Sequence, residues 1–389
     1  MIQPDSMPPW LKIWLSRNSS SFISLKECSV KINTLFSPIL YEFNKSLYVG
    51  PMQEVMLRWI KRHTDISIYL DRSNRFNSAP TEIAILCDPI VNLDTHDILI
   101  NQDNKLSLLD VSHHEKYSYS YILARNGLGD VDSYLSYLYS THLQRKCVID
   151  KAIIINTRWS SNNYYHWIHE ALPRLKLLYD NILDFADIPK IWGGPFPLLN
   201  YHYETLEKVG INPDKLIYLS GIIQIRKLIN ATMLHPGAFH PDQINYAKSF
   251  ISSPAENSMS VQHFQNVLVL RSKQSNRYLD EPIIIERLQK EYGFKPIYFE
   301  NYTVSEQADI MAHATCVIQS HGSGMTNIMH MRPGARIIEL MPDDSIHPGF
   351  MYLAEQAKLR YSMCICKSTT ARQVLKCCPT ELFDHLRCS

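Results

Sequence analysis

Two histidines and a glutamate lie close together in the stretch NNYYHWIHEALPRL, residues 162–175. His166, His169 and Glu170 are side chains of types that exchange protons, hold metal ions or orient one another. On a helix, Asn163, His166 and Glu170 would fall along one stripe, because residues three and four positions apart share a face. An apolar run precedes the stretch, so the cluster is expected in the first turn of a helix that follows a strand.

From the residues alone, three interpretations of this cluster stay open. The side chains form a general-base site, they ligate a metal ion in a hydrolase, or they make a polar helix face whose histidines bond nearby carbonyls. The order H-x-x-H-E differs from the zinc-protease order H-E-x-x-H, and no other cluster supplies an obvious third ligand. Pro173 lacks a backbone N–H and is expected to kink the helix just after Glu170. An apolar face is expected on another side of the helix, made of Ile168, Leu172, Leu175 and Tyr179.

A glycine-containing turn further along the chain has the composition of a phosphate site. The run 315–320 predicts a buried strand, and His321-Gly322-Ser323-Gly324 then leads into a helix. Glycines at the carboxyl end of a strand let backbone approach a ligand, and a helix start presents free N–H groups to an anion. Ser323 and Thr326 add hydroxyl donors. The alternative is a plain strand-to-helix turn that needs glycine for its geometry.

Two arginines and a glutamate accompany this turn. Arg271 ends the predicted strand 266–272 and Arg277 follows in the loop. If both reach the same sheet edge, their forked guanidinium groups suit a diphosphate; otherwise they are solvated surface arginines. Glu339 lies in the apolar strand 335–342, where an unpaired acid would be costly. At the edge of a nucleotide cleft it would accept hydrogen bonds from ribose hydroxyls.

These side chains need a scaffold that brings strand ends together, and the chain from residue 151 onward has that pattern. Apolar runs alternate with helical segments, which predicts parallel sheets built from right-handed βαβ units. The expected strands are 151–156, 190–194, 215–220, 266–272, 295–300, 315–320 and 335–342. The expected helices are 163–181, 201–210, 281–293 and 304–314, with a loop and helix at 322–334.

The fold class predicted from this alternation is α/β, with two Rossmann-like domains at residues 151–250 and 251–389 whose parallel sheets face a cleft. The stretch 236–262 has the composition of a linker. Residues 1–150 are interpreted as a mixed α+β region with short strands and a hairpin around QDNK. By elimination, this region is assigned to the acceptor or a partner.

Composition restricts the function classes. The chain has 389 residues, is 45% hydrophobic and 20% charged, and carries a net charge of +1. These values are typical of a globular protein and do not support electrostatic binding of nucleic acid or an anionic membrane. No apolar run approaches the roughly 18–20 residues that span a bilayer, and no signal segment is expected.

Cysteine usage favours a reducing compartment, because the nine cysteines are an odd number and scattered. Five lie near the C-terminus, with His385 nearby, in an order that is not a familiar zinc spacing. Buried or idle thiols, and no metal, are therefore expected of Cys364, Cys366, Cys377, Cys378 and Cys388.

Four motifs in order resemble glycosyltransferase family 61. SHGSGMTN followed by MRPGARIIELMP resembles the family's glycine turn and the strand after it. LRSKQSNRYLDE resembles its arginine segment, NYYHWIHEALPRL its N-x-x-H-x-x-x-[DE] segment, and FMYLAEQAKLRY its tail. The resemblance covers about residues 155 to 362, with Ser320 where the family usually has glycine or alanine.

The resemblance implies a GT-B-like fold and a metal-independent, inverting transfer from a nucleotide sugar. Glu170 is the first choice for the base, His166 would orient it or be the base itself, and His169 is a further site residue that contacts the acceptor. Asn163 and Tyr165 are expected to bind the acceptor. The expected donor-binding residues are Arg271 and Arg277 for the diphosphate, His321, Gly322, Ser323, Gly324, Thr326 and Asn327 around it, and Glu339 at the ribose.

The function predicted from the resemblance is transfer of a sugar, with a UDP-sugar as the expected donor, to a saccharide or lipid-linked saccharide. Capsule, lipopolysaccharide or exopolysaccharide biosynthesis is the expected setting. The protein is expected in the cytoplasm, peripheral to the inner face of the membrane and its polysaccharide-assembly machinery. No cofactor or metal is expected. The alternatives are a metal-dependent hydrolase using His166, His169 and Glu170, and a non-catalytic nucleotide-sugar-binding protein of the same fold.

Overall fold

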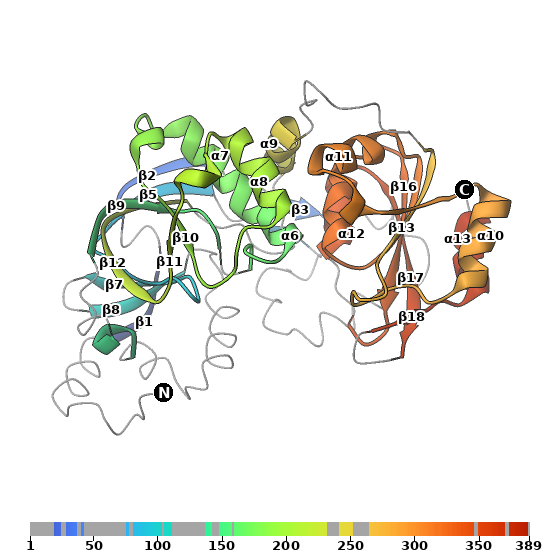
Figure 1. The fold of residues 1–389 in the computed structure, drawn as a ribbon, viewed down its shortest axis with the longest axis horizontal. Helices are drawn as coiled ribbons and strands as arrows, with labels where there is room; N and C mark the ends of the chain where they lie inside the picture. The colour runs from blue at the N-terminus through green and yellow to red at the C-terminus, as the bar shows by residue number, and fades with distance from the viewer. Residues whose placement is uncertain are drawn as a thin grey trace. The chain divides into compact units, whose positions relative to one another are not determined.

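The computed structural model describes thirteen stretches of the chain: residues 19–24, 29–36, 40–42, 75–77, 81–102, 105–110, 137–141, 148–157, 159–231, 241–251, 264–345, 349–369 and 373–387. The chain divides into two compact units. Unit 1 contains Met1–Ile39 and Ser78–His235, and unit 2 contains Leu40–Asn77 and Pro236–Ser389. Both are α/β structures with parallel strands (Figure 1).

Unit 1 is built on a mixed ten-stranded sheet with the order β1-β8-β7-β6-β12-β9-β10-β11, from which β5 and then β2 branch off β12. Strands β12, β9, β10 and β11 are mutually parallel, whereas β5 and β6 pair antiparallel with β12. The strands are β1 Ser19–Ser24, β2 Ser29–Phe36, β5 Thr81–Cys87, β6 Ile90–Asn92, β7 Asp97–Gln102, β8 Lys105–Asp110, β9 Val148–Ile154, β10 Lys190–Gly193, β11 Ile217–Leu219 and β12 Ile222–Ala231.

The pairing of β5 and β6 with β12 changes the predicted domain organisation. The hairpin expected around QDNK is confirmed, because β7 and β8 pair antiparallel with Gln102 opposite Lys105. Of the described strands within residues 1–150, β1, β2 and β5 to β8 join the sheet of the following residues, whereas the short strands at residues 40–42 and 75–77 pair with each other and belong to unit 2. The boundary between the compact units also falls after His235 rather than at residue 250. The first sheet is therefore mixed, and β12, which had no predicted counterpart, is central to it.

The helix expected at residues 163–181 forms as three consecutive pieces. These are α6 Tyr164–His166, the π-helical turn η4 Trp167–Ala171 and α7 Leu172–Asn181. The Leu172 N–H donates to the Trp167 carbonyl, five residues back, which defines the wide turn. Pro173 has no N–H to donate, so a regular ladder could not continue through this point. The irregularity predicted at Pro173 thus takes the form of a π-turn that contains Glu170.

Four short helices follow α7 in the expected βαβ order. They are η5 Phe185–Asp187, α8 Asn200–Leu206, η6 Glu207–Val209 and η7 Pro213–Lys215. Gly210 ends η6 in the left-handed conformation, with a φ of 70°, at the predicted helix end. The core contains Ala152 and Ile154 of β9, Ile191 of β10 and Ile225 of β12, with apolar residues of β5 to β7 packed around them.

Unit 2 contains a six-stranded sheet with the order β14-β13-β15-β16-β17-β18, parallel except for β18. Its strands are β13 Asn266–Leu270, β14 Lys295–Tyr298, β15 Cys316–Ser320, β16 Arg336–Pro342, β17 Arg360–Ser368 and β18 Leu375–Lys376, and β3 Leu40–Glu42 pairs separately with β4 Arg75–Asn77. Its helices are α9 Pro241–Ile251, α10 Pro282–Tyr292, η8 Phe299–Asn301, α11 Val304–His313, the 3₁₀ helix η9 Ser323–His330, α12 Gly349–Gln356 and α13 Pro379–Arg387.

The strand order of unit 2 reverses at one point of the sheet. Successive strands step from β13 outward to β14, and the chain then returns to β15 on the other side of β13. In open α/β sheets, ligands bind at the carboxyl ends of the strands where the order reverses. Here that point is the edge where β13 ends at Leu270 and β15 ends at Ser320. One correction concerns the predicted linker, which contains helix α9.

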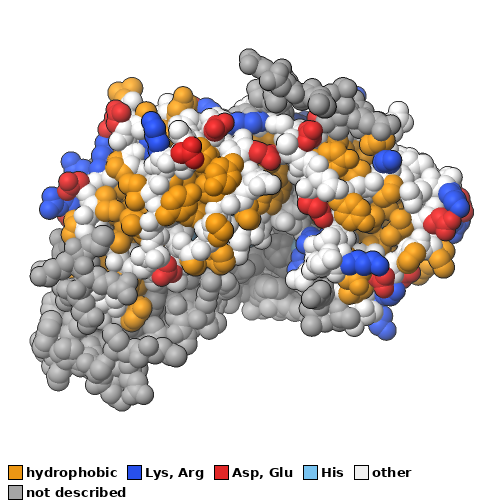
Figure 2. Space-filling model, viewed as in Figure 1, with side chains coloured by type: hydrophobic (Ala, Val, Ile, Leu, Met, Phe, Trp, Pro, Cys, Tyr) orange, Lys and Arg blue, Asp and Glu red, His pale blue; other side chains and the backbone are white. Residues whose placement is uncertain are grey.

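The visible surface agrees with the near-neutral composition. On the face drawn in Figure 2, basic and acidic side chains are scattered among hydrophobic ones over the described residues. Among those same residues, no helix combines the length and the apolar character needed to cross a bilayer.

Candidate active-site groups in the two units

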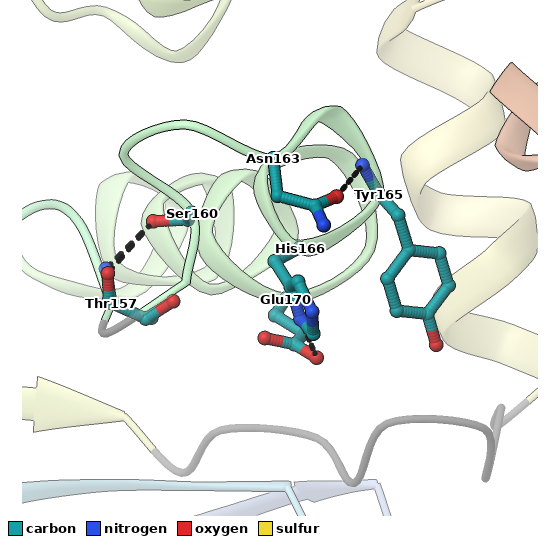
Figure 3. A network of polar contacts seen from close by, with 6 residues as sticks. All are labelled: Thr157, Ser160, Asn163, Tyr165, His166 and Glu170. Atoms are coloured by element: carbon teal, nitrogen blue, oxygen red, sulfur yellow. Dashed lines mark hydrogen bonds and ion pairs between the residues drawn. The ribbon is translucent and has the colours of Figure 1, made fainter. Parts of the chain in front are cut away.

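The loop after β9 is fixed before the histidine cluster begins. The side-chain amide of Asn156 donates to the Gly193 carbonyl at 2.7 Å, and its oxygen accepts from the Gly193 N–H at 2.8 Å. The Thr157 N–H donates to Ser160 Oγ at 2.7 Å, which closes a tight turn (Figure 3). These bonds tie the end of β9 to the end of β10, so helix α6 starts from a defined position at the carboxyl edge of this sheet.

His166 and Glu170 form a direct pair on the π-turn. His166 Nδ1 lies 2.8 Å from Glu170 Oε1, and the two side chains lie against each other below the turn (Figure 3). The His166 side chain is 17% exposed, whereas that of Glu170 is 1% exposed. A ring nitrogen bonded to a carboxylate carries the proton, so the opposite nitrogen, Nε2, is the basic atom. The exposed member of the pair is therefore the imidazole.

Two aromatic rings hold the His166 imidazole in this orientation. The Trp159 ring centroid lies 5.2 Å away, and the Tyr165 ring lies 5.0 Å away in an edge-on arrangement. Tyr165 also contacts His169, at 5.3 Å. Asn163 accepts a hydrogen bond from the Tyr165 N–H and thus caps helix α6. The predicted acceptor residues Asn163 and Tyr165 therefore lie beside the His166–Glu170 pair.

A buried arginine, which sequence reasoning missed, lies one turn after Glu170. Arg174 is 6% exposed and donates to the Ile154 and Ile155 carbonyls, at 2.8 and 3.2 Å, and to Asn230 Oδ1 at 3.2 Å. Burial lowers the pKa of Arg174 to about 10, and the charge of Glu170 acts in the opposite direction. Glu170 Oε2 is buried and has no hydrogen-bond partner among the described residues. The arginine charge therefore compensates a carboxylate that water does not reach. In the sequence, Arg174 could have been predicted as a partner of Glu170 from its position four residues later on the same helix.

Burial corrects the two helix faces expected from the sequence. Ile168, Leu172 and Leu175 are fully buried as predicted, but Tyr179 is 46% exposed. His169 and Glu170 are 3% and 1% exposed, so the polar cluster does not form a solvated stripe. The π-turn inserts one extra residue per turn and rotates the following side chains, which a regular helical projection does not capture.

The cluster does not have the geometry of a metal triad. A bound metal ion would need the ligand atoms of His166, His169 and Glu170 close together. Among the described residues, these atoms do not all lie within 4.8 Å of one another. The orientation of His166 toward Glu170 instead resembles the pairing of a base with the carboxylate that orients it.

In unit 2, the turn after β15 is shaped around an arginine. A Cβ placed on Gly322 would lie 2.0 Å from Arg271 Nη1, so any larger residue would displace the guanidinium. Arg271 follows directly on β13, which is adjacent to β15 in the sheet. The structure thus brings Arg271 and Gly322 together at the edge where the strand order reverses.

The two predicted phosphate arginines lie within electrostatic range of each other. Burial lowers the pKa of Arg271, the positive charge of Arg277 lowers it further, and Glu300 raises it. Burial also lowers the pKa of Arg277, against the influence of Asp344 and Glu339. Arg277 adopts a left-handed backbone with a φ of 61°, and its Nε donates to Gln373 Oε1 at 2.7 Å. Two partly buried, mutually repelling cations favour an anion between or beside them.

Glu339 is placed differently from the ribose contact expected of it. It is fully buried, and its Oε1 lies 2.5 Å from His321 Nδ1 while its Oε2 accepts a bond from the Tyr361 hydroxyl. Both carboxylate oxygens are therefore engaged inside unit 2. Glu339 is thus bonded to the side chain of His321, which is 8% exposed. Tyr361, the last residue of the family-like tail, is the partner that sequence reasoning did not name.

The remaining predicted donor residues lie at two depths. Ser323 and Gly324 are partly exposed at the start of η9, while Thr326 and Asn327 are fully buried within it. Asn327 Nδ2 donates to Gln307 Oε1 at 2.8 Å, which ties η9 to α11. A Cβ placed on Gly324 would lie only 2.6 Å from Gln319 Nε2. Ser323 and Gly324 are thus the more exposed of these residues, whereas the buried Asn327 holds η9 against α11.

A protein-family model matches part of the chain. Residues 164–338 match the family model described as Glycosyltransferase 61. The matched range begins at α6, just before His166, and ends one residue before Glu339. No curated protein matches the chain.

Proposed function

Because residues 164–338 form a glycosyltransferase 61 domain, we propose that this glycosyltransferase moves a sugar from a nucleotide-sugar donor to a saccharide acceptor with inversion at the anomeric carbon. The observation that carries the proposal is the arginine pair at the reversal point of the unit 2 sheet, with Arg271 packed on Gly322. This arrangement suits a diphosphate, which is the charged part shared by nucleotide-sugar donors.

The donor half of the proposal uses residues of unit 2. Arg271 and Arg277 bind the diphosphate and stabilise the negative charge that develops when the bond between the sugar and the phosphate oxygen breaks. Ser323 and the backbone at Gly324 add donors at the start of η9. His321, held by Glu339, donates from its other ring nitrogen to the donor. Glu339 is then a positioning residue rather than a ribose ligand.

The acceptor half uses residues of unit 1. His166 Nε2 takes the proton of the acceptor hydroxyl while that oxygen attacks the anomeric carbon opposite the leaving diphosphate. Glu170 holds the proton on Nδ1 and stabilises the imidazolium that forms. This assignment exchanges the first and second choices predicted from the sequence, because the imidazole is the more exposed group. His169, Tyr165 and Asn163 remain the proposed contacts around the acceptor.

The finer predictions belong to this proposal as well. They are a GT-B architecture, a UDP-sugar donor, metal-independent transfer, a polysaccharide-assembly setting and a cytoplasmic location beside the membrane. The two arginines support metal independence because they supply the positive charge that a cation would otherwise supply to the diphosphate.

Nucleotide binding tests the donor site. UDP, GDP and CMP are titrated calorimetrically, with EDTA present, into wild type and Arg271→Ala. One nucleotide is expected to bind with a micromolar Kd, and Arg271→Ala is expected to weaken it at least tenfold. The matched control is Arg287→Ala, since Arg287 on α10 pairs with Glu291 at the surface. The proposal fails if none of the nucleotides binds, or if both variants bind like wild type.

Turnover separates the transferase from a non-catalytic binding protein. Slow hydrolysis of the bound nucleotide sugar, measured by release of the nucleoside diphosphate, is expected of wild type and lost in His166→Ala. Binding without hydrolysis or transfer, over a panel of saccharide acceptors, would favour the non-catalytic alternative.

A further inference from the structure

Three cysteines converge in unit 2, although their spacing in the sequence is not one typical of zinc sites. Cys364 and Cys366 lie on β17, and Cys377 follows β18. Their sulfur atoms all lie within 4.8 Å of one another, and Cys366 Sγ is 2.6 Å from Cys377 Sγ. The three side chains are 0%, 0% and 6% exposed. The prediction of buried or idle thiols is thus confirmed for the burial of these three, while their convergence was not predicted. Cys388 lies outside the described residues.

The β17–β18 pairing explains the convergence. The strands run antiparallel with Lys367 opposite Lys376, so the next pair along is Cys366 with Cys377. Cys364 lies two positions before Cys366 and therefore on the same face of β17. Tyr361, which binds Glu339, lies on the alternate face. The cysteine group is thus on the face of the sheet opposite Tyr361 and Glu339.

Helix α13 supplies an imidazole to the same region. His385 is 8% exposed, and its Nε2 is buried without a hydrogen-bond partner among the described residues. His385 acts electrostatically on the Cys364 thiol, and α13 packs against β17. Glu381, one turn earlier, already accepts from the Ile365 N–H at 3.3 Å. The His385 ring nitrogens lie outside the 4.8 Å group, so this side chain would turn toward the sulfurs to complete a ligand set. A buried ring nitrogen without a partner is costly, and a metal ion would satisfy Nε2.

We propose that Cys364, Cys366, Cys377 and His385 form a structural zinc site. Three thiolates and one imidazole are a donor set that tetrahedral structural zinc uses, with Zn–S distances of about 2.3 Å. That geometry puts bound sulfurs about 3.8 Å apart, so Cys366 and Cys377 separate slightly when the ion enters. The ion would join β17, β18 and α13 into one closed edge of the sheet.

A disulfide is the rival explanation for the short Cys366–Cys377 contact. It would use two of the three sulfurs and leave Cys364 and the His385 imidazole without a role. The zinc site uses all four side chains. Cys316 is a free cysteine outside this group, and burial raises the pKa of its thiol to about 11.

Metal content of the full-length protein tests the proposal. The protein is purified without chelator from zinc-supplemented medium, and zinc is measured by mass spectrometry of the dissolved metal. About one zinc per chain is expected for wild type, with loss in Cys377→Ser and Cys364→Ser. Cys378→Ser is the matched control, because this exposed neighbour is outside the group and should keep the ion. X-ray absorption of the bound zinc should show three sulfur ligands and one nitrogen, and His385→Ala should remove the nitrogen.

Wild type alone decides the proposal if the serine variants fail to fold. The proposal is overturned if wild type is purified without zinc and takes up neither zinc nor cobalt while Cys364, Cys366 and Cys377 can all be alkylated. A Cys366–Cys377 disulfide found in non-reduced peptides of the purified protein would also overturn it. Nucleotide binding measured on the same preparations keeps this test separate from the transferase proposal, because the group lies on the other face of the sheet.

Discussion

At the scale of the residue, the His166–Glu170 pair determines which group accepts the proton. His166→Ala is expected to lower kcat by roughly 10²–10⁴, because the proposed base is lost. The KM for the donor should stay within about twofold. Added imidazole should restore part of the rate, since the space vacated by the ring is partly open to solvent. The measurement is steady-state kinetics with and without imidazole.

Glu170→Gln serves as the matched comparison for that rescue. An amide keeps the shape of the carboxylate but favours the wrong ring tautomer of His166, so the rate should fall while imidazole gives no recovery. If Glu170 itself were the base, His166→Ala would retain most of the activity. That result would identify the Glu170 carboxylate as the base.

Gly322 tests whether the Arg271 position matters for donor binding. Gly322→Ala places a methyl group 2.0 Å from Arg271 Nη1, so the guanidinium must move, and the φ of 156° adds backbone strain to the substitution. Donor affinity should fall about tenfold, or roughly 1.4 kcal/mol, in calorimetric titration. Gly293→Ala is the control, because nothing lies within 4 Å of its Cβ although its φ of 66° makes the substitution strained. Reduced stability with unchanged donor affinity is expected there, and equal affinity losses in both variants would contradict the prediction.

At the scale of the element, a buried histidine couples helix α8 to the loop that starts the candidate site. His202 Nδ1 accepts from the Leu199 N–H at 2.8 Å, which leaves Nε2–H to donate to the Ser160 carbonyl at 3.0 Å. The rings of Trp167 and Trp192 surround it, with centroids 4.5 and 4.8 Å away. Protonation of Nδ1 would break the bond to Leu199. The neutral ring is therefore part of the structure.

The pH dependence of stability follows from that histidine. Burial lowers the pKa of His202 from 6.5 to about 4, against the opposing effect of its bond to Ser160. Between these values the unfolded chain binds more protons than the folded one, so stability is full above about pH 6.5 and falls toward pH 4. The free energy of unfolding should drop by about 2 kcal/mol from pH 7 to pH 5 on account of this group. Urea denaturation at both pH values measures it.

His202→Asn isolates the contribution. Asparagine keeps an acceptor near the Leu199 N–H and does not titrate, so the variant should be less stable at pH 7 but lose about 2 kcal/mol less on acidification. Identical pH dependence in wild type and variant would show that other groups control acid stability.

The elements that could be predicted are those whose signal is local. Strands β9, β10 and β13 to β16 are continuous apolar runs with turn residues between them, and Gly210 ends its helix where expected. The joining of β5 and β6 to β12 depends on pairing between distant segments, which no local pattern encodes. The π-turn and the burial of Glu170 and Glu339 depend on tertiary contacts, as does the cysteine group. The residue types of the candidate site were thus predictable, but the partner of each side chain was not.

At the scale of the whole molecule, the candidate groups are divided between the two compact units. The proposed base pair lies in unit 1 and the proposed diphosphate site in unit 2. The family match spans both, since it runs from α6 into β16. The proposed base and the proposed diphosphate ligands thus belong to different units, and the proposed donor binding uses side chains of unit 2 alone.

This division predicts a clean separation of the two defects. Glu170→Gln should abolish turnover while leaving the Kd for the nucleotide within about twofold, because its carboxylate belongs to unit 1. Arg271→Ala should weaken nucleotide binding at least tenfold, yet at saturating donor it should retain more turnover than Glu170→Gln. Calorimetry and product release on the same two variants measure both quantities. Loss of nucleotide binding in Glu170→Gln would mean that unit 1 contributes directly to the donor site, and the assignment of one function to each unit would then be wrong.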